Sequence, residues 1–294
     1  MSDPVGILVV DKPVGITSHG VVSRARRALG TRKIGHAGTL DPDATGVLVL
    51  GVGQATRLLG YLSASDKDYA STFVLGQSTV TDDSAGDTLA WVDAGHLAHP
   101  DIERAMTSFT GDIEQRPSSV SAVKVDGKRA YDLVRSGADV ALAARPVTVT
   151  RFDLVSTRAE VRDGHAVTVI DVSVACSAGT YVRALARDLG ASLGVGGHVA
   201  ALRRTRSGPF TLDDAVELDD LGPGTTLVTP ARAASRTLPT VTIDAEAARL
   251  ARHGVQLPWP ASVAKGPTAF VEGDQLVGIA QERGGRTAWA TVFA

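Results

Sequence analysis

The residue best suited to chemistry is Asp41, an aspartate in a glycine-rich stretch that spans residues 35–46. Glycines in this stretch allow the backbone to approach a ligand closely and to adopt conformations closed to other residues. Pro42 has a fixed φ and biases Asp41 toward extended geometry. The pattern therefore predicts a carboxylate presented from a stiff loop rather than from a helix. An ordinary turn is the alternative, because Asp-Pro is a common turn dipeptide.

Other candidate side chains each have a plain structural interpretation as well. Aromatic residues make up only 4% of the chain, so Tyr69 stands out, although a strand aromatic is most often packed in a core. Taken alone, Arg183 suggests a surface charge on a helix, and His36 a structural hydrogen-bonding group. Cys176 is the only cysteine, which excludes an intrachain disulfide, and we expect it to pack rather than to react. No spacing of Cys and His suggests a zinc site.

The composition is that of a globular, reduced protein with one large domain or two ordinary ones. The chain has 294 residues, of which 44% are hydrophobic and 21% are charged. Its N-terminus lacks the pattern of a signal peptide, and no apolar run reaches the roughly 20 residues of a membrane span, so a cytoplasmic location is expected.

The distribution of charge is more informative than its sum. The formal net charge is −2, which does not by itself indicate a nucleic-acid-binding protein. Residues 12–40, however, hold basic residues and no acidic one, and a second basic group follows at 203–206. If the two groups converge in the fold, they form a groove for an anionic ligand; two solvated faces are the alternative.

Hydrophobic periodicity predicts the elements that position these residues. Strands are expected at 6–10, 47–52, 67–75, 147–155, 167–174 and 199–206, and helices at 102–109, at 180–193 and from Ser18, as the capping residue, to near Gly30. Residues 76–98 are rich in Asp, Gly, Ser and Thr and are predicted to form a loop. A linker is expected at the end of an acidic, then Pro/Gly/Thr-rich stretch, 213–239, followed by a helix at 245–252 and a small β module. The irregular order of strands and helices favours an α+β fold over a doubly wound sheet.

Five blocks, in this order, resemble the bacterial tRNA pseudouridine synthases of the TruB type. They are residues 11–18 (Asp-Lys-Pro-Val-Gly-Ile-Thr-Ser), 35–42 (Gly-His-Ala-Gly-Thr-Leu-Asp-Pro), 67–69 (Lys-Asp-Tyr), 115–124 (Gln-Arg-Pro-Ser-Ser-Val-Ser-Ala-Val-Lys) and 176–183 (Cys-Ser-Ala-Gly-Thr-Tyr-Val-Arg). Ser118 stands where a second proline is common in that family. A lone Leu-Asp-Pro would be a weak signal, whereas the ordered set is a strong one.

The resemblance implies an isomerase that converts uridine to pseudouridine in the T loop of tRNA, at the position conventionally numbered 55. It implies that Asp41 is the essential carboxylate, which either attacks the ribose or abstracts a proton from it. Tyr69 would stack on the flipped base, and Arg183 would oppose the effect of desolvation on the carboxylate. The substrate-binding residues implied are His36, Lys67, Tyr181, Leu202, Lys12 and Lys124. The reaction involves no redox change, so no cofactor and no metal is expected.

The implied fold is α+β: a pseudouridine synthase fold with a mixed, largely antiparallel sheet flanked by helices, plus a small C-terminal β-rich PUA-like domain. We expect a catalytic domain at 1–238, with an RNA-gripping insertion at about 112–146, and a PUA-like RNA-binding domain at 239–294. The expected partner is the T stem-loop of tRNA, and the protein is expected to be a monomer. No guide RNA, no membrane and no obligate protein partner is expected. Phosphate contacts are expected from Lys12, Arg24, Arg27, Lys124, Lys128, Arg129 and residues 203–206.

Two other interpretations stay open at this stage. The first is a non-enzymatic RNA-binding or tRNA-folding module; the intact set of Asp41, Tyr69 and Arg183 argues against a purely binding role, although a role in folding tRNA is compatible with catalysis. The second is a guide-RNA-dependent relative, which is disfavoured because such relatives carry fuller PUA modules and extensions that dock partners, whereas this chain ends at Ala294.

Overall fold

The computed structural model describes residues 4–118, 124–125, 128–129 and 142–293. Contacts divide the chain into two compact units. Unit 1 comprises the described residues up to 42, together with 46–65 and 207–293; unit 2 comprises 43–45 and the described residues of 66–206. The predicted domain boundary between residues 238 and 239 stays a prediction.

One layer of unit 1 is a small sheet covered by a helix. Strand β1 (Gly6–Lys12) pairs antiparallel with β3 (Thr45–Val52) and parallel with β14 (Val216–Glu217), and β2 (Ile34–His36) pairs antiparallel with β3. Helix α1 (Ser18–Ala28) buries its apolar stripe against the sheet, in a core formed by Val21, Val22 and Ala25 with Leu8, Val10, Leu48 and Leu50. The expected strands at 6–10 and 47–52 are confirmed.

The first turn of α1 differs from the prediction by one residue. Thr17, not Ser18, caps the helix: its Oγ1 accepts the N–H of Gly20 at 2.9 Å. The hydroxyl of Ser18 is thereby left for another partner, Leu40, described below.

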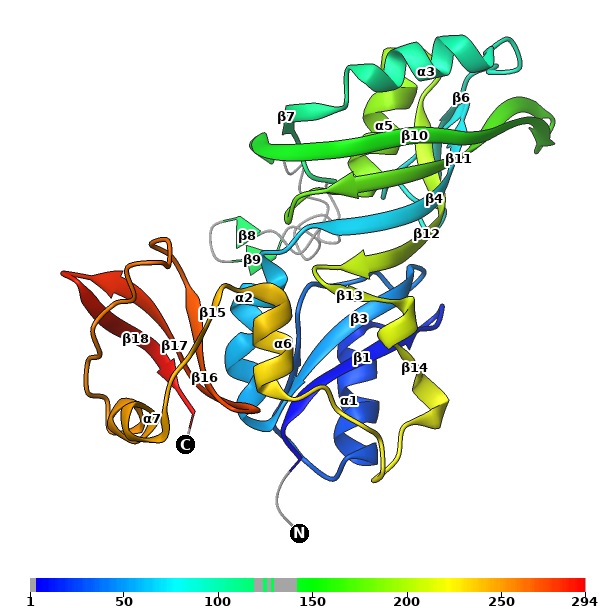
Figure 1. The fold of residues 1–294 in the computed structure, drawn as a ribbon. Coiled ribbons are helices and arrows are strands. Elements are labelled where there is room, and N and C mark those ends of the chain that lie inside the picture. Colours follow the sequence, from blue (N-terminus) through cyan, green and yellow to red (C-terminus); the bar gives the residue numbers. More distant parts are fainter. Residues whose placement is uncertain (1–3, 119–123, 126–127, 130–141, 294) are drawn as a thin grey trace. The chain divides into compact units, whose positions relative to one another are not determined.

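The C-terminal part of unit 1 is a second sheet with two helices. Its strands follow the order β15 (Thr240–Thr242), β16 (Thr268–Glu272), β17 (Gln275–Arg283) and β18 (Arg286–Val292), and α7 (Ala245–Arg252) packs on β17 (Figure 1). The predicted helix at 245–252 and small β module are confirmed. The acidic, then Pro/Gly/Thr-rich stretch before it holds β13 (Phe210–Thr211), the short helices η2 (Leu212–Asp214) and η3 (Leu218–Asp220), and α6 (Pro230–Thr237).

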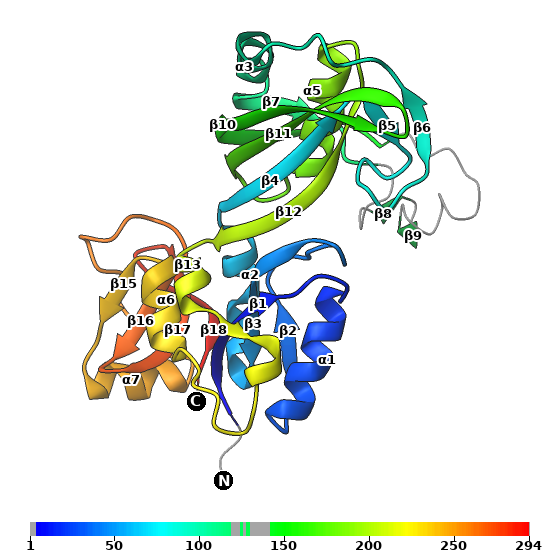
Figure 2. The ribbon, with the colours of Figure 1, turned by 90° about the vertical axis from the view of Figure 1, so that its right-hand side faces the viewer.

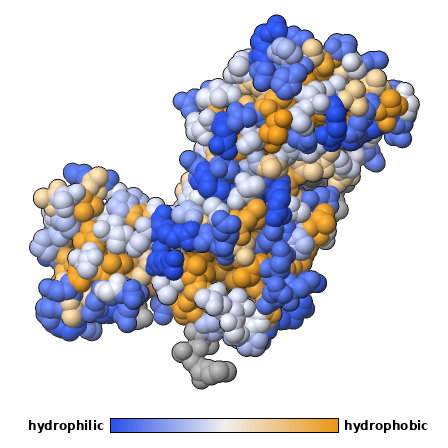
Figure 3. Space-filling model, turned by 45° about the vertical axis from the view of Figure 1, so that its right-hand side comes forward, coloured by the Kyte–Doolittle hydropathy of each residue, from blue (hydrophilic) through white to orange (hydrophobic). Residues whose placement is uncertain are grey.

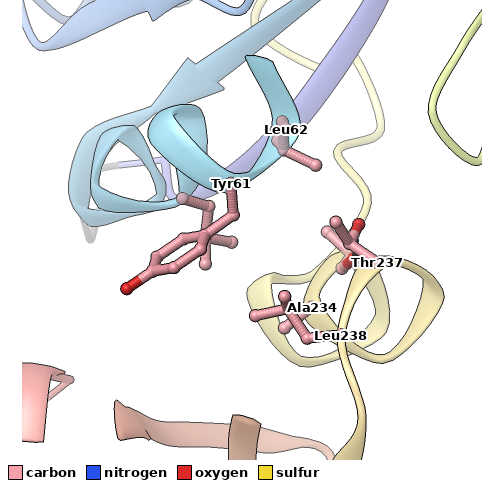
Figure 4. A pocket seen from close by; sticks show the side chains of 7 residues that line it. Tyr61, Leu62, Ala234, Thr237 and Leu238 are labelled. Atoms are coloured by element: carbon pink, nitrogen blue, oxygen red, sulfur yellow. Dashed lines mark hydrogen bonds between the residues drawn. The ribbon is translucent and has the colours of Figure 1, made fainter. Parts of the chain in front are cut away.

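A continuous hydrophobic core joins the two sheets of unit 1. It contains Ile7, Val9 and Val49 of the first sheet, Phe210, Ala234 of α6, and Ala269 and Ile279 of the second sheet. Helix α6, the short helix η1 (Gly53–Leu58) and α2 (Leu59–Ser63) contribute to it. Between α2 and α6 lies an apolar crevice beside Leu62 and Leu238 (Figure 4) that leaves no room for a water molecule. It is therefore a packing seam rather than a ligand site.

Unit 2 is built on an antiparallel sheet. The strands lie in the order β12 (Gly197–Ser207), β4 (Lys67–Leu75), β11 (His165–Cys176), β10 (Arg145–Arg162) and β7 (Gly111–Gln115). Helix α5 (Val182–Ser192) packs on β4, and α3 (His99–Thr107) packs on β10 and on α5 (Figure 2). The strands expected at 67–75, 147–155, 167–174 and 199–206 are confirmed, as are the helices at 102–109 and 180–193.

The predicted loop at 76–98 is wrong in part, because it contains a hairpin. Strand β5 (Gln77–Thr79) pairs with β6 (Thr88–Trp91). A further two-residue pair, β8 (Lys124–Val125) and β9 (Lys128–Arg129), lies within the expected insertion.

Exposed hydrophobic side chains such as Val155 and Val161 stand among polar residues of β10, and Figure 3 shows hydrophobic and hydrophilic residues interspersed over one face. The α+β class with largely antiparallel sheets is confirmed.

Candidate active site

The loop that carries Asp41 is anchored on both sides by the first block of the sequence. Lys12 at the end of β1 is fully buried, and its Nζ donates to the carbonyl oxygens of Pro13 and Pro42, each at 2.9 Å. The N–H of Gly15 donates to the same Pro42 oxygen at 2.9 Å. The carbonyl oxygen of Pro42, the residue that follows Asp41, thus accepts hydrogen bonds from two donors. Within unit 1 the Lys12 ammonium supports the loop, and its predicted contact with RNA stays a prediction.

Ser18 fixes the residue directly before Asp41. Its Oγ donates to the carbonyl oxygen of Leu40 at 3.0 Å and accepts the N–H of Leu40 at 2.9 Å. Both residues are buried, so each bond also satisfies a polar group that water does not reach. The sequence analysis considered Ser18 as a helix cap and as the end of the first block, and it missed this role. The carboxylate is consequently held between two fixed backbone positions, while its own side chain is partly exposed.

A pair of histidines lies beside this loop. His36 ends β2, opposite Leu50 of β3, and its ring meets that of His19 edge to face, with centroids 5.4 Å apart. His19 is an exposed residue of the first turn of α1, and the sequence analysis did not single it out. Unit 1 therefore holds three of the predicted site residues: Asp41, His36 and Lys12.

Unit 2 carries Lys67 and Tyr69 on one face of β4. Both are buried, and on β11 they face Cys176 and Val174 respectively. They share one face of the strand, since Asp68 between them points to the other side and pairs with Arg206 at 2.7 and 3.0 Å. That ion pair occupies one of the arginines predicted to contact phosphate.

Burial around β4 shifts the pKa values of a lysine amine and a cysteine thiol in opposite directions. Burial, and next the positive charge of Arg204, lower the pKa of Lys67 to about 8. Arg204 is itself buried, with 1% of its surface exposed. Burial raises the pKa of Cys176 to about 11, so this residue is a thiol at neutral pH.

Helix α5 presents Arg183 in its first turn. The side chain is buried; its Nη1 donates to the carbonyl oxygen of Thr81 at 2.7 Å and lies 3.5 Å from Oδ2 of Asp83. A turn later, Arg187 forms an ion pair with Asp82 at 3.1 Å. Burial raises the pKa of Asp82, and the backbone of that residue has a positive φ of 58°. A strained backbone of this kind is held by its surroundings and is typical of functional sites.

The segment 81–83 holds the partners of Arg183 and Arg187, and sequence reasoning missed these contacts. Its two aspartates fall within residues 76–98, which the sequence analysis assigned to a loop. The available signal was the pair of adjacent carboxylates itself, which a buried arginine needs as partners.

Beside Arg187 lies an open pocket of about 480 Å³ that is lined by Glu114, Arg116, Ala144, Arg187 and Asp188. Its lining holds two carboxylates and two guanidinium groups, so it has no single sign of charge.

The remaining predicted residues lie in unit 2 as well. Tyr181 directly precedes α5 and Leu202 lies on β12, both half-buried. The backbone of Lys124 belongs to β8, and most of the block at 115–124 lies outside the described residues. Among the residues that the structure describes, no group of three or more His, Cys, Asp and Glu side chains is placed to hold a metal ion. In the same part of the chain, no helix has the length and apolar character needed to span a membrane.

Comparison with known families gives matches over most of the chain. Residues 26–182 match the N-terminal domain of TruB family pseudouridylate synthases, and residues 183–235 match the tRNA pseudouridylate synthase B C-terminal domain. The tRNA pseudouridine synthase B of Mycobacteroides abscessus is 49% identical over 297 aligned positions, which cover 100% of this chain and 98% of the relative. That of Nocardia farcinica is 51% identical, with 97% and 92% covered.

Solved structures give the same result for the fold. A chain of a Cbf5–Nop10–Gar1 complex superposes with a TM-score of 0.74 at 27% identity, covering 99% of this chain and 85% of that one. A chain of an H/ACA RNP bound to a substrate RNA containing 2′-deoxyuridine gives a TM-score of 0.73 at the same identity and coverage. The predicted fold, with its small C-terminal sheet, is therefore confirmed.

Proposed function

Because the chain belongs to the TruB family of pseudouridylate synthases, we propose that it converts uridine 55 in the T loop of tRNA to pseudouridine. The observation that carries this proposal is the loop around Asp41, in which Lys12, Gly15 and Ser18 fix the backbone on either side of one partly exposed carboxylate. A site that positions a reacting group in advance lowers the entropic part of the barrier.

The reaction is an isomerisation, so substrate and product have the same atoms. The C1′–N1 bond breaks, the uracil turns, and a C1′–C5 bond forms; the proton on C5 is lost and N1 gains one. Asp41 either attacks C1′ or removes a proton from the ribose. Arg183 supplies the positive charge that stabilises the carboxylate, and Tyr69 stacks on the flipped base. The family relationship supports these roles, and Tyr69 and Arg183 are each buried within unit 2.

The substrate is recognised through shape and phosphates rather than through a guide. We propose that the insertion at about 112–146 and a PUA-like domain at 239–294 bind the T stem-loop, and that His36 takes the space vacated when the T loop opens. Lys67, Tyr181, Leu202 and Lys124 complete the substrate-binding set. The relatives named tRNA pseudouridine synthase B favour a stand-alone enzyme acting in the cytoplasm. The structural neighbour solved with Nop10 and Gar1 motivates the competing, partner-dependent interpretation.

Tritium release tests the proposal directly. A tRNA transcript with tritium at uridine C5 is incubated with the purified chain alone, without guide RNA or partner protein, and the product is mapped. We expect release by the wild type at the T loop and none by Asp41→Asn, which keeps the size of the side chain and removes its charge. Retained tRNA binding by Asp41→Asn would also allow a separate measurement of tRNA folding.

Two outcomes would contradict the proposal. Release by Asp41→Asn at the wild-type rate would remove Asp41 from the chemistry. Binding of tRNA by the wild type without any release would favour a binding module, and release that appears only when a guide and partner proteins are added would favour the guided class.

A further inference from the structure

The start of the insertion is attached to α5 by a buried amide. Gln115 ends β7 and has only 2% of its surface exposed. Its Nε2 donates to the carbonyl oxygen of Tyr181 at 3.1 Å, and its Oε1 accepts the N–H of Tyr181 at 2.8 Å. Tyr181 is the residue that precedes α5, and no side chain caps this helix from within its own sequence. The Gln115 amide therefore holds the backbone of the residue at which the helix begins.

A second attachment lies six residues further along the same helix, between one and two turns away. Arg187 Nη2 donates to the carbonyl oxygen of Arg116 at 2.8 Å, and Nη1 forms the ion pair with Asp82. Arg116 directly follows β7. One guanidinium thus joins the residues after β7 to the segment 81–83, and the planar group with its fixed donors suits such a double contact.

Arg183 lies between these two attachments. It is two residues after Tyr181 and four residues before Arg187, and it contacts Thr81 and Asp83 on either side of Asp82. A shift of α5 relative to β7 would therefore move the Arg183 guanidinium. A misplacement of about 1 Å in a catalytic group is enough to slow a reaction by about 100-fold.

We propose that Gln115 and Arg187 are positioning residues, which fix the first two turns of α5 to the start of the insertion and so hold Arg183 in its working place. This inference rests on the proposed function. It connects the segment expected to grip RNA with Arg183, the arginine expected to act in the chemistry. The contacts that make this connection involve neither Asp41 nor the RNA.

Single-turnover kinetics test this inference. Gln115→Met and Arg187→Met remove the contacts with little change in volume, and enzyme is used in saturating excess over tritiated tRNA. Under these conditions a partly unfolded enzyme sample changes neither the end point nor the rate constant, as long as the folded fraction saturates the RNA. We expect the rate constant to fall about 10- to 100-fold, and the enzyme concentration for half-saturation to change by less than about 3-fold.

Two comparisons separate positioning from general destabilisation. The controls Gln77→Met and Arg158→Met remove partly exposed side-chain bonds in the same unit and should leave the rate constant within about 2-fold of wild type. In the double variant of Gln115→Met and Arg183→Lys, the combined loss should be smaller than the product of the separate losses, because both changes act on one guanidinium.

Each contrary result has a distinct meaning. Wild-type rate constants in Gln115→Met and Arg187→Met would overturn the inference and leave the proposed function intact, as would fully multiplicative losses in the double variant. A wild-type protein that releases no tritium would instead overturn the proposed function together with this inference.

Discussion

At the scale of single residues, Lys67 is the clearest case of a side chain whose pKa the folded protein shifts. An ordinary lysine is charged at all physiological pH values, whereas burial, and next Arg204, lower the pKa of Lys67 to about 8. The same residue is expected to bind substrate. Its charge, and hence its attraction for a phosphate, is then present below about pH 8 and is lost above it.

The lowered pKa also predicts a pH dependence of stability. Between about pH 8 and the ordinary lysine pKa of 10.5, the unfolded chain binds a proton at Lys67 that the folded chain does not. The free energy of unfolding should therefore rise with pH in this window, by an amount on the order of 3 kcal/mol at full separation. The measurement is denaturant unfolding of the wild type and of Lys67→Met from pH 7 to 10.

The contribution of Lys67 is the difference between the two curves. Lys265→Met is the matched control, because Lys265 is exposed and pairs with Glu282 at the surface. Its curve should run parallel to that of the wild type. A Lys67→Met curve parallel to wild type throughout would show that the amine titrates at its ordinary pKa.

At the scale of elements, the first turn of α1 and the loop 37–42 behave as one assembly. Ser18 contributes both bonds to Leu40, and Lys12 and Gly15 hold Pro42. We expect Ser18→Ala to lower the free energy of unfolding by about 1–3 kcal/mol, because two buried backbone groups lose their partner. The rate constant of isomerisation should fall as well, since the residue before Asp41 loses its anchor.

Ser23→Ala is the control for this prediction. Ser23 lies on the exposed side of the same helix, and its Oγ donates to the carbonyl oxygen of His19 at 3.0 Å. Its removal should change stability by less than about 0.5 kcal/mol and leave the rate unchanged. Equal effects of the two serine variants, measured by denaturant unfolding and single-turnover kinetics, would mean that the bonds to Leu40 do not fix the loop.

Elements were predictable where the pattern was long, and not where a short segment depended on distant partners. The strand of Lys67 and Tyr69 and the helix of Arg183 followed from periodicity alone. The hairpin β5–β6 did not, because its turn-forming composition is equally that of a loop. Helix α6 was missed although Thr229 caps it and Pro230 starts it, which is an ordinary N-terminal signature.

The site was predictable to a similar degree and for a related reason. Asp41 and its loop could be recognised because the constraint is local: glycines and a proline shape a few consecutive residues. The roles of Ser18, Gln115 and Asp82 could not, because each depends on a partner 22 or more positions away that only folding brings close. Buried polar side chains in such pairs carry no periodic signal in the sequence.

At the scale of the whole molecule, charge is separated along the chain although it nearly cancels in sum. Arg27, Arg32 and Lys33 at the end of α1 and after it are exposed, whereas the acidic residues lie elsewhere in the sequence. Arg24 on the same helix already pairs with Asp219 at 2.7 Å. An exposed ion pair of this kind contributes little stability, and Asp219 competes with a phosphate for the Arg24 guanidinium.

This arrangement predicts that affinity for tRNA falls as salt concentration rises. The logarithm of the binding constant should decrease linearly with the logarithm of salt, because each neutralised phosphate releases counterions. Arg27→Gln should lower the slope by about 1 and weaken binding at low salt. Arg24→Gln should have a smaller effect at low salt, because Asp219 already partly neutralises the positive charge of Arg24.

Arg104→Gln is the control for these measurements, since Arg104 is an exposed arginine of α3 that pairs with Asp101 within its own helix. Filter binding of an unmodified transcript between about 50 and 200 mM salt covers the range in which phosphate contacts dominate. If the slope is near zero for the wild type, the basic run at 12–40 is a solvated face. If Arg104→Gln and Arg27→Gln lower the slope equally, the attraction is a property of net charge rather than of this surface, and recognition of the T stem has to rest on other parts of the chain.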